Sequence, residues 1–143
     1  FLDCQRHMLY NENMSQRLTE NNFSGAAIGE PVYIGENVSV MSGSVIESGS
    51  VIDNNAVVKG GKVNGYVGIG SVVSERCDIN SAVVCHGAVL DSGVKCGEYS
   101  VIGEKAHIAS EAVIEKGVGI WSGKTVEKGT RLYENVKRSS DLS

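Results

Sequence analysis

Apolar residues recur about every six positions along most of this chain. The series has eighteen members, and every gap is six except a gap of nine from Val58 to Val67 and a gap of five from Ile79 to Val84. The members are Ile28, Ile34, Val40, Ile46, Ile52, Val58, Val67, Val73, Ile79, Val84, Leu90, Cys96, Ile102, Ile108, Ile114, Ile120, Val126 and Leu132. Two residues before each member stands a small or β-branched residue, with Lys124 as the exception. A helix or a lone hairpin does not produce this period, whereas a hexapeptide-repeat β-solenoid does.

Glycine and asparagine mark the predicted corners of the solenoid. They fill twelve of the eighteen positions that lie three residues after an apolar member, namely Asn37, Gly43, Gly49, Asn55, Gly61, Gly70, Gly87, Gly93, Gly117, Gly123, Gly129 and Asn135. Both residues tolerate a positive φ better than the others do. Three short strands and three corners make a coil of about 18 residues. The chain is therefore predicted to be all-β, a single-stranded parallel β-helix of about six triangular coils.

The period also predicts the domain organisation. Residues 1–24 lack the repeat, and we expect a short N-terminal helix over Phe1–Tyr10 followed by a polar linker. The β-helix is expected over residues 25–137, with a flexible tail at 138–143. The gap of nine predicts a protruding loop at Gly60–Tyr66, and the gap of five predicts a tightened corner at Asn80–Val83. Because the chain begins at Phe1 rather than at methionine, a fragment of a longer protein is one expectation.

Composition and charge exclude several classes of partner. The formal net charge is -4 and no basic cluster is present, which argues against nucleic acid and anionic membranes. No apolar run is long enough to span a bilayer, and no signal peptide opens the chain. The cysteines are Cys4, Cys77, Cys85 and Cys96, without a CxxC pair. This spacing indicates neither a zinc site nor a disulfide framework, so a cytoplasmic location is expected.

Stacked coils turn the outward positions into columns, which predict two apolar sides and one charged side. The charged side is expected to carry Asp78, Lys95 and Arg131 and to face solvent. The two apolar sides are predicted to mediate self-association into a homo-oligomer, a trimer first, with a dimer or tetramer as alternatives. The alternative to self-association is that these outward residues are β-branched only because parallel sheets favour such residues on both faces. The expected interface residues are Tyr33, Val45, Val51, Tyr66, Val72, Val83, Val89, Val101, His107 and Trp121.

Two histidines lie in the repeat, and one has the spacing of a catalytic base. His86 stands one coil below Glu104, which allows a histidine–carboxylate contact of the kind that orients a general base. An ordinary surface pair has the same spacing. His107 is expected at an interface and His7 on the surface. Two histidines that are not stacked do not make the three-histidine zinc site of gamma-class carbonic anhydrases, so no metal site is predicted.

Two segments resemble a known family of enzymes. Residues Gly29–Val38 resemble the entry into the C-terminal left-handed β-helix of sugar-1-phosphate nucleotidyltransferases. Residues Val118–Gly129 resemble the closing coil of the mannose-1-phosphate guanylyltransferase-like members, although Ser122 stands where proline is common. The stretch Phe1–Tyr10 with its linker resembles the junction between the two domains of such enzymes. The resemblance implies that the coils are left-handed.

The resemblance further implies that this chain is a non-catalytic part. In that family an N-terminal domain uses Mg²⁺ to convert NTP and sugar 1-phosphate into NDP-sugar and diphosphate, and its Gly-rich signature has no counterpart here. The chain would then serve oligomerisation or regulation, joined in cis to a nucleotidyltransferase domain and without a cofactor of its own. The alternative hypothesis is a hexapeptide-repeat acyltransferase that depends on acetyl-CoA, with His86 as general base and Glu104 as its partner.

Overall fold

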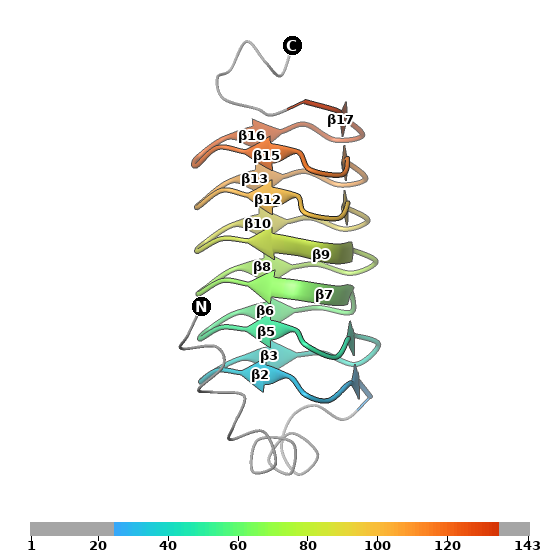
Figure 1. Cartoon of the computed structure of the whole chain (residues 1–143), viewed down its shortest axis with the longest axis vertical. Coiled ribbons are helices and arrows are strands. Elements are labelled where there is room, and N and C mark those ends of the chain that lie inside the picture. Colours follow the sequence, from blue (N-terminus) through green and yellow to red (C-terminus); the bar gives the residue numbers. More distant parts are fainter. Residues whose placement is uncertain (1–24, 135–143) are drawn as a thin grey trace.

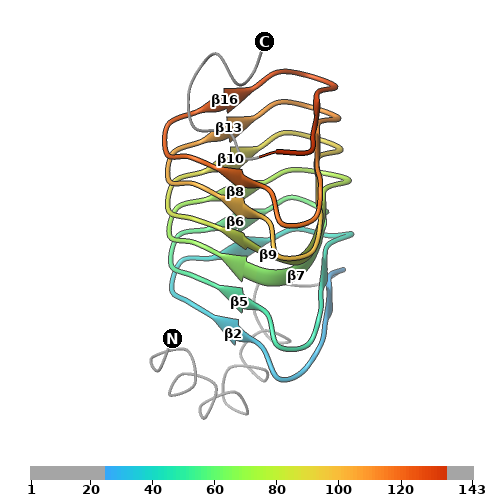
Figure 2. The same cartoon turned by 45° about the horizontal axis from the view of Figure 1, so that its top comes forward.

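The computed structural model describes residues 25–134, which form a parallel β-solenoid of about six coils (Figure 1, Figure 2). No helix is present among these described residues. Most strands are only two residues long and are joined by tight turns. The all-β solenoid predicted from the period is thus confirmed. The predicted helix at residues 1–10 and the predicted tail at 138–143 lie outside the described residues.

Strands from successive coils stack into the three sides of a prism. The first, which we call the charged side, holds β1 (Ala27–Ile28), β4 (Val45–Ile46), β11 (Lys95–Cys96), β14 (Val113–Ile114) and β17 (Arg131–Leu132). The second, the apolar side, holds β2 (Tyr33–Ile34), β5 (Val51–Ile52), β12 (Val101–Ile102) and β15 (Gly119–Ile120). The third, the histidine side, holds β3 (Ser39–Val40), β6 (Val57–Val58), β8 (Val72–Val73), β10 (Val89–Leu90), β13 (His107–Ile108) and β16 (Thr125–Val126).

Two longer strands, β7 (Lys62–Val67) and β9 (Asp78–Val84), continue from the charged side round the corner onto the apolar side. They join these two sides into one eleven-stranded sheet, whereas the histidine side is a separate sheet of six strands. All pairings are parallel, and all are in register apart from one shift between β7 and β9, so that Val89 lies below His107 and Leu90 below Ile108. Each coil is held to the next by backbone hydrogen bonds, such as that from the amide of His107 to the carbonyl of Lys124 at 2.9 Å.

The apolar series of the sequence fills the interior of the prism. Nearly every member of the series is buried, although Ile28 in the first described coil is half-buried. The column two residues earlier also points inward, and its buried serines have hydrogen-bond partners. Ser44 and Ser71, for example, donate to the carbonyl oxygens of Val58 and Cys85. Burying each Ile, Val or Leu side chain contributes about 1.5–3 kcal/mol, which offsets the conformational entropy lost on folding.

The corners largely follow the glycine and asparagine pattern. Asn37, with φ 58°, and Asn55, with φ 63°, adopt left-handed conformations, as do most of the predicted glycines. At the irregular corner after β6, Gly60 rather than the predicted Gly61 has positive φ. Five further residues adopt positive φ without being glycine or asparagine, namely Arg76, Ser81, Tyr99, Lys105 and Glu111. Corner geometry in this fold therefore overrides local preference where the stacked coils require it.

The predicted loop at Gly60–Tyr66 is wrong, because most of it is the regular strand β7. Val63 is completely buried and points into the core like the other members of the apolar series. The gap of nine is therefore a step of five followed by a step of four. The step of five at Asn80–Val83 is likewise part of a strand, β9, and Ser81 forms a bulge opposite the junction between Asn64 and Gly65.

Because Val63 is an additional inward residue, the outward residues before β7 lie one side away from the side that the period predicts. Val45 pairs with Lys62 on the charged side, not with the predicted apolar column. Tyr33 and Val51 lie instead below Tyr66 on the apolar side. Of the other expected interface residues, Val83, Val101 and Trp121 also belong to the apolar side, whereas Val72, Val89 and His107 belong to the histidine side. The predicted charged column of Asp78, Lys95 and Arg131 is present.

Candidate functional site

The histidine and acid that the sequence pairs, His86 and Glu104, stand at the corner between the apolar and histidine sides. Val84 pairs with Ile102 just before this corner, and the amide of Lys105 donates to the carbonyl of His86 at 2.9 Å. The two residues are thus stacked in neighbouring coils, as predicted, and both are exposed. The structure shows no hydrogen bond between their side chains. The carboxylate therefore does not orient the His86 imidazole in this conformation.

A histidine–carboxylate pair does form on the histidine side. Nε2 of His107 lies 2.8 Å from Oδ2 of Asp91, and the two side chains are 47% and 36% exposed. Asp91 belongs to the preceding coil, two residues after Val89, which is the direct neighbour of His107. The carboxylate therefore reaches the imidazole diagonally across the coil boundary.

This pair does not have the spacing of one full coil that predicts the contact between His86 and Glu104. The diagonal contact has a spacing of sixteen residues, from Asp91 to His107. The signal that would have found it is an acid directly after an apolar strand, next to an outward histidine in the following coil.

The surroundings of His107 leave one ring nitrogen available. Val89 lies below it and Thr125 above it in the same column, and Ala109 follows on the same strand edge. Among the described residues Nδ1 has no hydrogen-bond partner, while Nε2 contacts Asp91. When Nε2 of the neutral imidazole donates to Asp91, the other ring nitrogen can accept a proton, which is the arrangement that a general base needs.

The cysteines of the solenoid do not have the properties of nucleophiles. Burial raises the pKa of Cys77 and of Cys96, which are inside the prism. Burial, and then the charge of Glu104, raise the pKa of the half-buried Cys85 next to His86. A reactive cysteine needs a lowered pKa, because the thiolate is the nucleophile. These three cysteines therefore do not indicate a thiol nucleophile.

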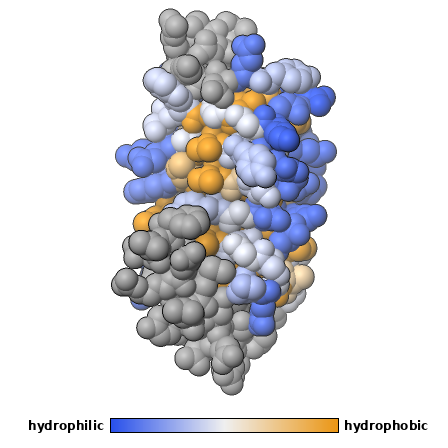
Figure 3. Space-filling view, in the orientation of Figure 1, coloured by the Kyte–Doolittle hydropathy of each residue, from blue (hydrophilic) through white to orange (hydrophobic). Residues whose placement is uncertain are grey.

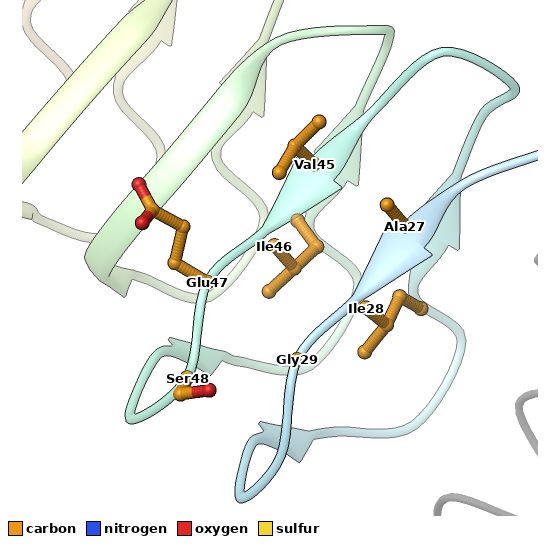
Figure 4. A pocket seen from close by; sticks show the side chains of 7 residues that line it. All are labelled: Ala27, Ile28, Gly29, Val45, Ile46, Glu47 and Ser48. Atoms are coloured by element: carbon orange, nitrogen blue, oxygen red, sulfur yellow. The ribbon is translucent and has the colours of Figure 1, made fainter.

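A hollow of about 380 Å³ lies on the charged side near the first described coil. It is lined by Ala27, Ile28, Gly29, Val45, Ile46, Glu47 and Ser48 (Figure 4). In Figure 4 the Glu47 side chain points toward the next coil, where its carboxylate lies 3.6 Å from Nζ of Lys62. With one carboxylate already paired and no histidine or cysteine in its lining, this hollow does not contain a catalytic group of the kind found on the histidine side.

Ion pairs at the surface join neighbouring coils. Arg131 pairs with Glu115, whose hydrogen bond raises the pKa of the guanidinium. Arg76 reaches Glu111 at 3.0 Å across the corner occupied by Gly93. The two arginine side chains are exposed, at 60% for Arg131 and 66% for Arg76, and pairs of this kind each contribute little to stability.

No metal or membrane site is evident in the described part of the chain. Among residues 25–134 no three His, Cys, Asp or Glu side chains are grouped as metal ligands. A membrane-spanning helix is likewise not found in this part.

Comparison with known proteins identifies relatives only among solved structures. No family model matches the chain, and no curated protein matches it. One similar structure is a histidine-to-alanine variant of GDP-perosamine N-acetyl transferase from Caulobacter crescentus, in complex with CoA and GDP-perosamine. It is 20% identical with a TM-score of 0.53, and the match covers 87% of this chain and 56% of that one.

A second structure is a histidine-to-asparagine variant of perosamine N-acetyltransferase from the same organism, in complex with the same two molecules. It is 20% identical with a TM-score of 0.54, and the match covers 93% of this chain and 60% of that chain. This chain therefore spans less than two thirds of the length of either protein. At this identity, the likeness establishes a shared fold.

The expected role as the β-helix part of a sugar-1-phosphate nucleotidyltransferase is wrong. The two similar structures above are acetyltransferases, and neither supports the associated Mg²⁺ or nucleotidyltransferase domain. The two segments that suggested that family, Gly29–Val38 and Val118–Gly129, are regular parts of the solenoid in the structure. Their likeness follows from the repeat that all such helices share. The chain shares the left-handed β-helix fold of these two acetyltransferases.

Proposed function

We propose that this chain is the β-helix part of an acyltransferase that takes an acyl group from an acyl-CoA. The shared fold supports this proposal, since both similar structures are acetyltransferases in complex with CoA. The acceptor would be an amino or hydroxyl group. GDP-perosamine in those complexes makes a nucleotide-linked amino sugar the first class of acceptor to test. The observation in this structure that carries the proposal is the contact between His107 and Asp91.

The reaction needs one base and no redox partner. The acceptor nitrogen or oxygen attacks the thioester carbon, and the imidazole accepts the proton that the acceptor loses. As the tetrahedral intermediate collapses, the carbon–sulfur bond breaks and the new amide or ester remains. The leaving thiolate takes the proton back from the imidazolium, giving free CoA and a neutral histidine. Atoms and charge balance over the cycle.

His107 is the first candidate for this base, because its contact with Asp91 orients the ring. His86, with Glu104 in the next coil, is the second candidate. Their side chains are not in contact here, but catalytic hydrogen bonds are often long in structures without substrate and tighten when it binds. Both histidines are exposed, so either is accessible to an acceptor.

The test is transfer from acetyl-CoA to a nucleotide-linked amino sugar, with the acetylated product measured by mass spectrometry. His107→Asn is expected to lower kcat by about 10²–10⁴-fold, the usual contribution of a general base. Asp91→Asn is expected to lower it at least about tenfold, because the ring loses its orienting charge. Lys95→Ala, on the charged side, should leave the rate unchanged and serves as the control.

The outcomes separate the function from the choice of base. Loss of activity in His86→Asn with full activity in His107→Asn would assign the base to His86. Absence of CoA binding by calorimetry, together with absence of transfer to amine and hydroxyl acceptors, would contradict the acyltransferase proposal itself.

A further inference from the structure

The turn that carries Asp91 is closed differently from its neighbours. It stands at the corner between the histidine and charged sides, where the carbonyl of the first turn residue usually accepts a hydrogen bond from the amide three positions later. Bonds of this kind join Ser44 to Met41 at 3.1 Å, Cys77 to Ser74 at 3.4 Å, Ala112 to Ala109 at 3.3 Å and Thr130 to Glu127 at 3.2 Å. Among the described residues, no such bond joins the amide of Val94 to the carbonyl of Asp91. Another group must therefore hold this carbonyl.

The thiol of Cys77 holds the carbonyl of Asp91. It donates to that oxygen with 3.0 Å between the sulfur and the oxygen. Cys77 lies directly below Val94 in the inward column that precedes the strands of the charged side. Burial raises the pKa of this thiol, and backbone hydrogen bonds to the sulfur, that from Val94 first, partly offset the rise. The sulfur thus contacts both ends of a turn that a direct backbone bond closes in other coils.

The contact lies inside the prism, where water does not compete with it. Polar side chains flank the apolar ones on the face of the molecule that Figure 3 shows, and water competes there for their hydrogen bonds. Cys77, by contrast, is only 2% exposed. A buried polar group that loses its partner is costly, so the thiol stays on the carbonyl.

The residue below each turn decides how that turn is closed. Below the four directly closed turns stand residues whose side chains have no hydrogen-bond donor, namely Ala26, Gly61, Val94 and Ala112. Ser44 stands in the same column two coils before Cys77. Its hydroxyl donates to the carbonyl of Val58 at 3.3 Å and accepts from the amide of Gly60 at 2.8 Å. A donor in this column therefore bridges the turn of the next coil, and a hydroxyl does so as well as a thiol.

Backbone hydrogen bonds fix the rest of the Asp91 turn to the neighbouring coils. The amide of Gly93 donates to the carbonyl of Glu75 in the coil below at 2.9 Å. The amide of Glu111 in the coil above donates to the carbonyl of Ser92 at 3.0 Å. Within the described part of the chain, the carbonyl of Asp91 is held by a side chain alone. A change of that side chain therefore acts on Asp91 first.

We propose that Cys77 is a positioning residue, which holds the backbone of Asp91 where its carboxylate reaches His107. The consequence for catalysis rests on the acyl-transfer proposal above. Without the donor, the turn is free to close by the direct bond from Val94, as the turn above Ala112 does, and the backbone of Asp91 moves. The carboxylate reaches across the coil boundary to lie 2.8 Å from Nε2 of His107, so a small displacement weakens the contact.

The first test follows the imidazole of His107 by NMR, on the full chain in reducing buffer and without substrate. Cys77→Ala and Cys77→Val both remove the donor, and alanine and valine occupy this column in other coils, so both variants should fold. We expect the ring signals of His107 to move in the direction in which Asp91→Ala moves them, while those of His86 stay in place. Cys77→Ser should restore the wild-type signals, because it restores a donor.

The second test is the rate of acetyl transfer. Cys77→Ala is expected to lower kcat about three- to tenfold, which corresponds to the loss of one hydrogen bond, and to leave KM for the acceptor unchanged, since the thiol is buried. Cys77→Ser should restore kcat. In a His107→Asn background, Cys77→Ala should lower kcat no further, because the thiol acts only through that imidazole.

Ser44→Ala is the matched control. It removes the same kind of buried contact from the same column, two coils away from Asp91. It should lower stability by a similar amount, measured by thermal melting, and leave both kcat and the His107 signals unchanged.

Two results would overturn the proposal. One is a set of unchanged His107 signals in folded Cys77→Ala and Cys77→Val. The other is a Ser44→Ala variant that moves these signals as far as Cys77→Ala does, which would reduce the effect to a general loss of stability. A chain that shows the expected signals but no acyl transfer would support the positioning role of Cys77 and contradict the proposed function alone.

Discussion

At the scale of single residues, burial in the prism changes the chemistry of Cys96 most. It occupies a position that isoleucine or valine fills in other coils, and it is 2% exposed. Burial, and to a lesser extent the charges of Cys77 and Asp78, raise the pKa of the thiol far above its ordinary value of 9.0. In the interior the neutral thiol is a small hydrophobic group, and its anion is strongly disfavoured. The residue is therefore a core residue, not a reactive cysteine.

The raised pKa predicts a loss of stability at alkaline pH. Above about pH 9 the unfolded chain loses the Cys96 proton while the folded chain keeps it, so the free energy of unfolding falls as pH rises. The fall from this thiol is about 1.4 kcal/mol for each pH unit above the unfolded value. Urea titrations in reducing buffer at pH 8 and pH 10 should show a smaller loss for Cys96→Val than for the wild type. Equal losses in the two proteins would contradict this assignment.

At the scale of secondary-structure elements, β7 is the strand that determines how the early coils are oriented. It carries two inward residues, Val63 and Val67, only four positions apart, and it turns the corner without a regular loop. Gly65 makes this possible with φ 137°. A Cβ at this position would meet the carbonyl oxygen of Ala82 and lie 3.0 Å from its amide nitrogen. The two coils can approach this closely only because residue 65 has no side chain.

Gly65→Ala is therefore expected to destabilise the protein by roughly 2–4 kcal/mol, since backbone atoms must move to relieve the contact. Gly117→Ala is the matched control. Gly117 also has a positive φ, 74°, but nothing lies within 4 Å of its Cβ position. That variant should lose only about 1 kcal/mol, the cost of a left-handed alanine. Denaturant titrations measure both values, and equal losses would show that the contact with Ala82 is not limiting.

At the scale of the whole molecule, the strands of each coil pair only with those of the coils above and below it. The strands pair in sequence order along each side, from β1 to β17 on the charged side and from β3 to β16 on the histidine side. Stability in such a stack is approximately a sum of terms for single coils and for neighbouring pairs. The end coils have one neighbour and the central coils have two. The Arg76–Glu111 pair adds a link that spans a complete intermediate coil.

This arrangement predicts graded protection of backbone amides. Hydrogen exchange should be slowest in β8 to β12 and faster toward β1 and β17, because opening an end coil breaks one interface instead of two. Exchange measured by mass spectrometry on the full chain tests the gradient. Uniform protection from end to end would show that the solenoid opens only as one unit.

The six-residue period determined the fold class, nearly all the inward residues and most corners without any structural information. This is possible because strand alternation and corner geometry are local, so the residues of each short segment are enough to predict its conformation. In the tertiary structure, the two segments that resemble nucleotidyltransferases, Gly29–Val38 and Val118–Gly129, are regular parts of the solenoid. A repeat of this kind specifies the fold and leaves the chemistry of the protein open.

Only the tertiary structure decided which side of the prism each outward residue occupies. Val63 adds one inward position, and because the sides follow one another around the axis, that single addition rotates all earlier coils by one side. The contact between Asp91 and His107 likewise depends on how two coils are stacked, which no spacing within one coil reveals. The side of the prism on which a residue lies, and the residues that it contacts, depend on how all the coils are stacked. The period, by contrast, is a property of each coil.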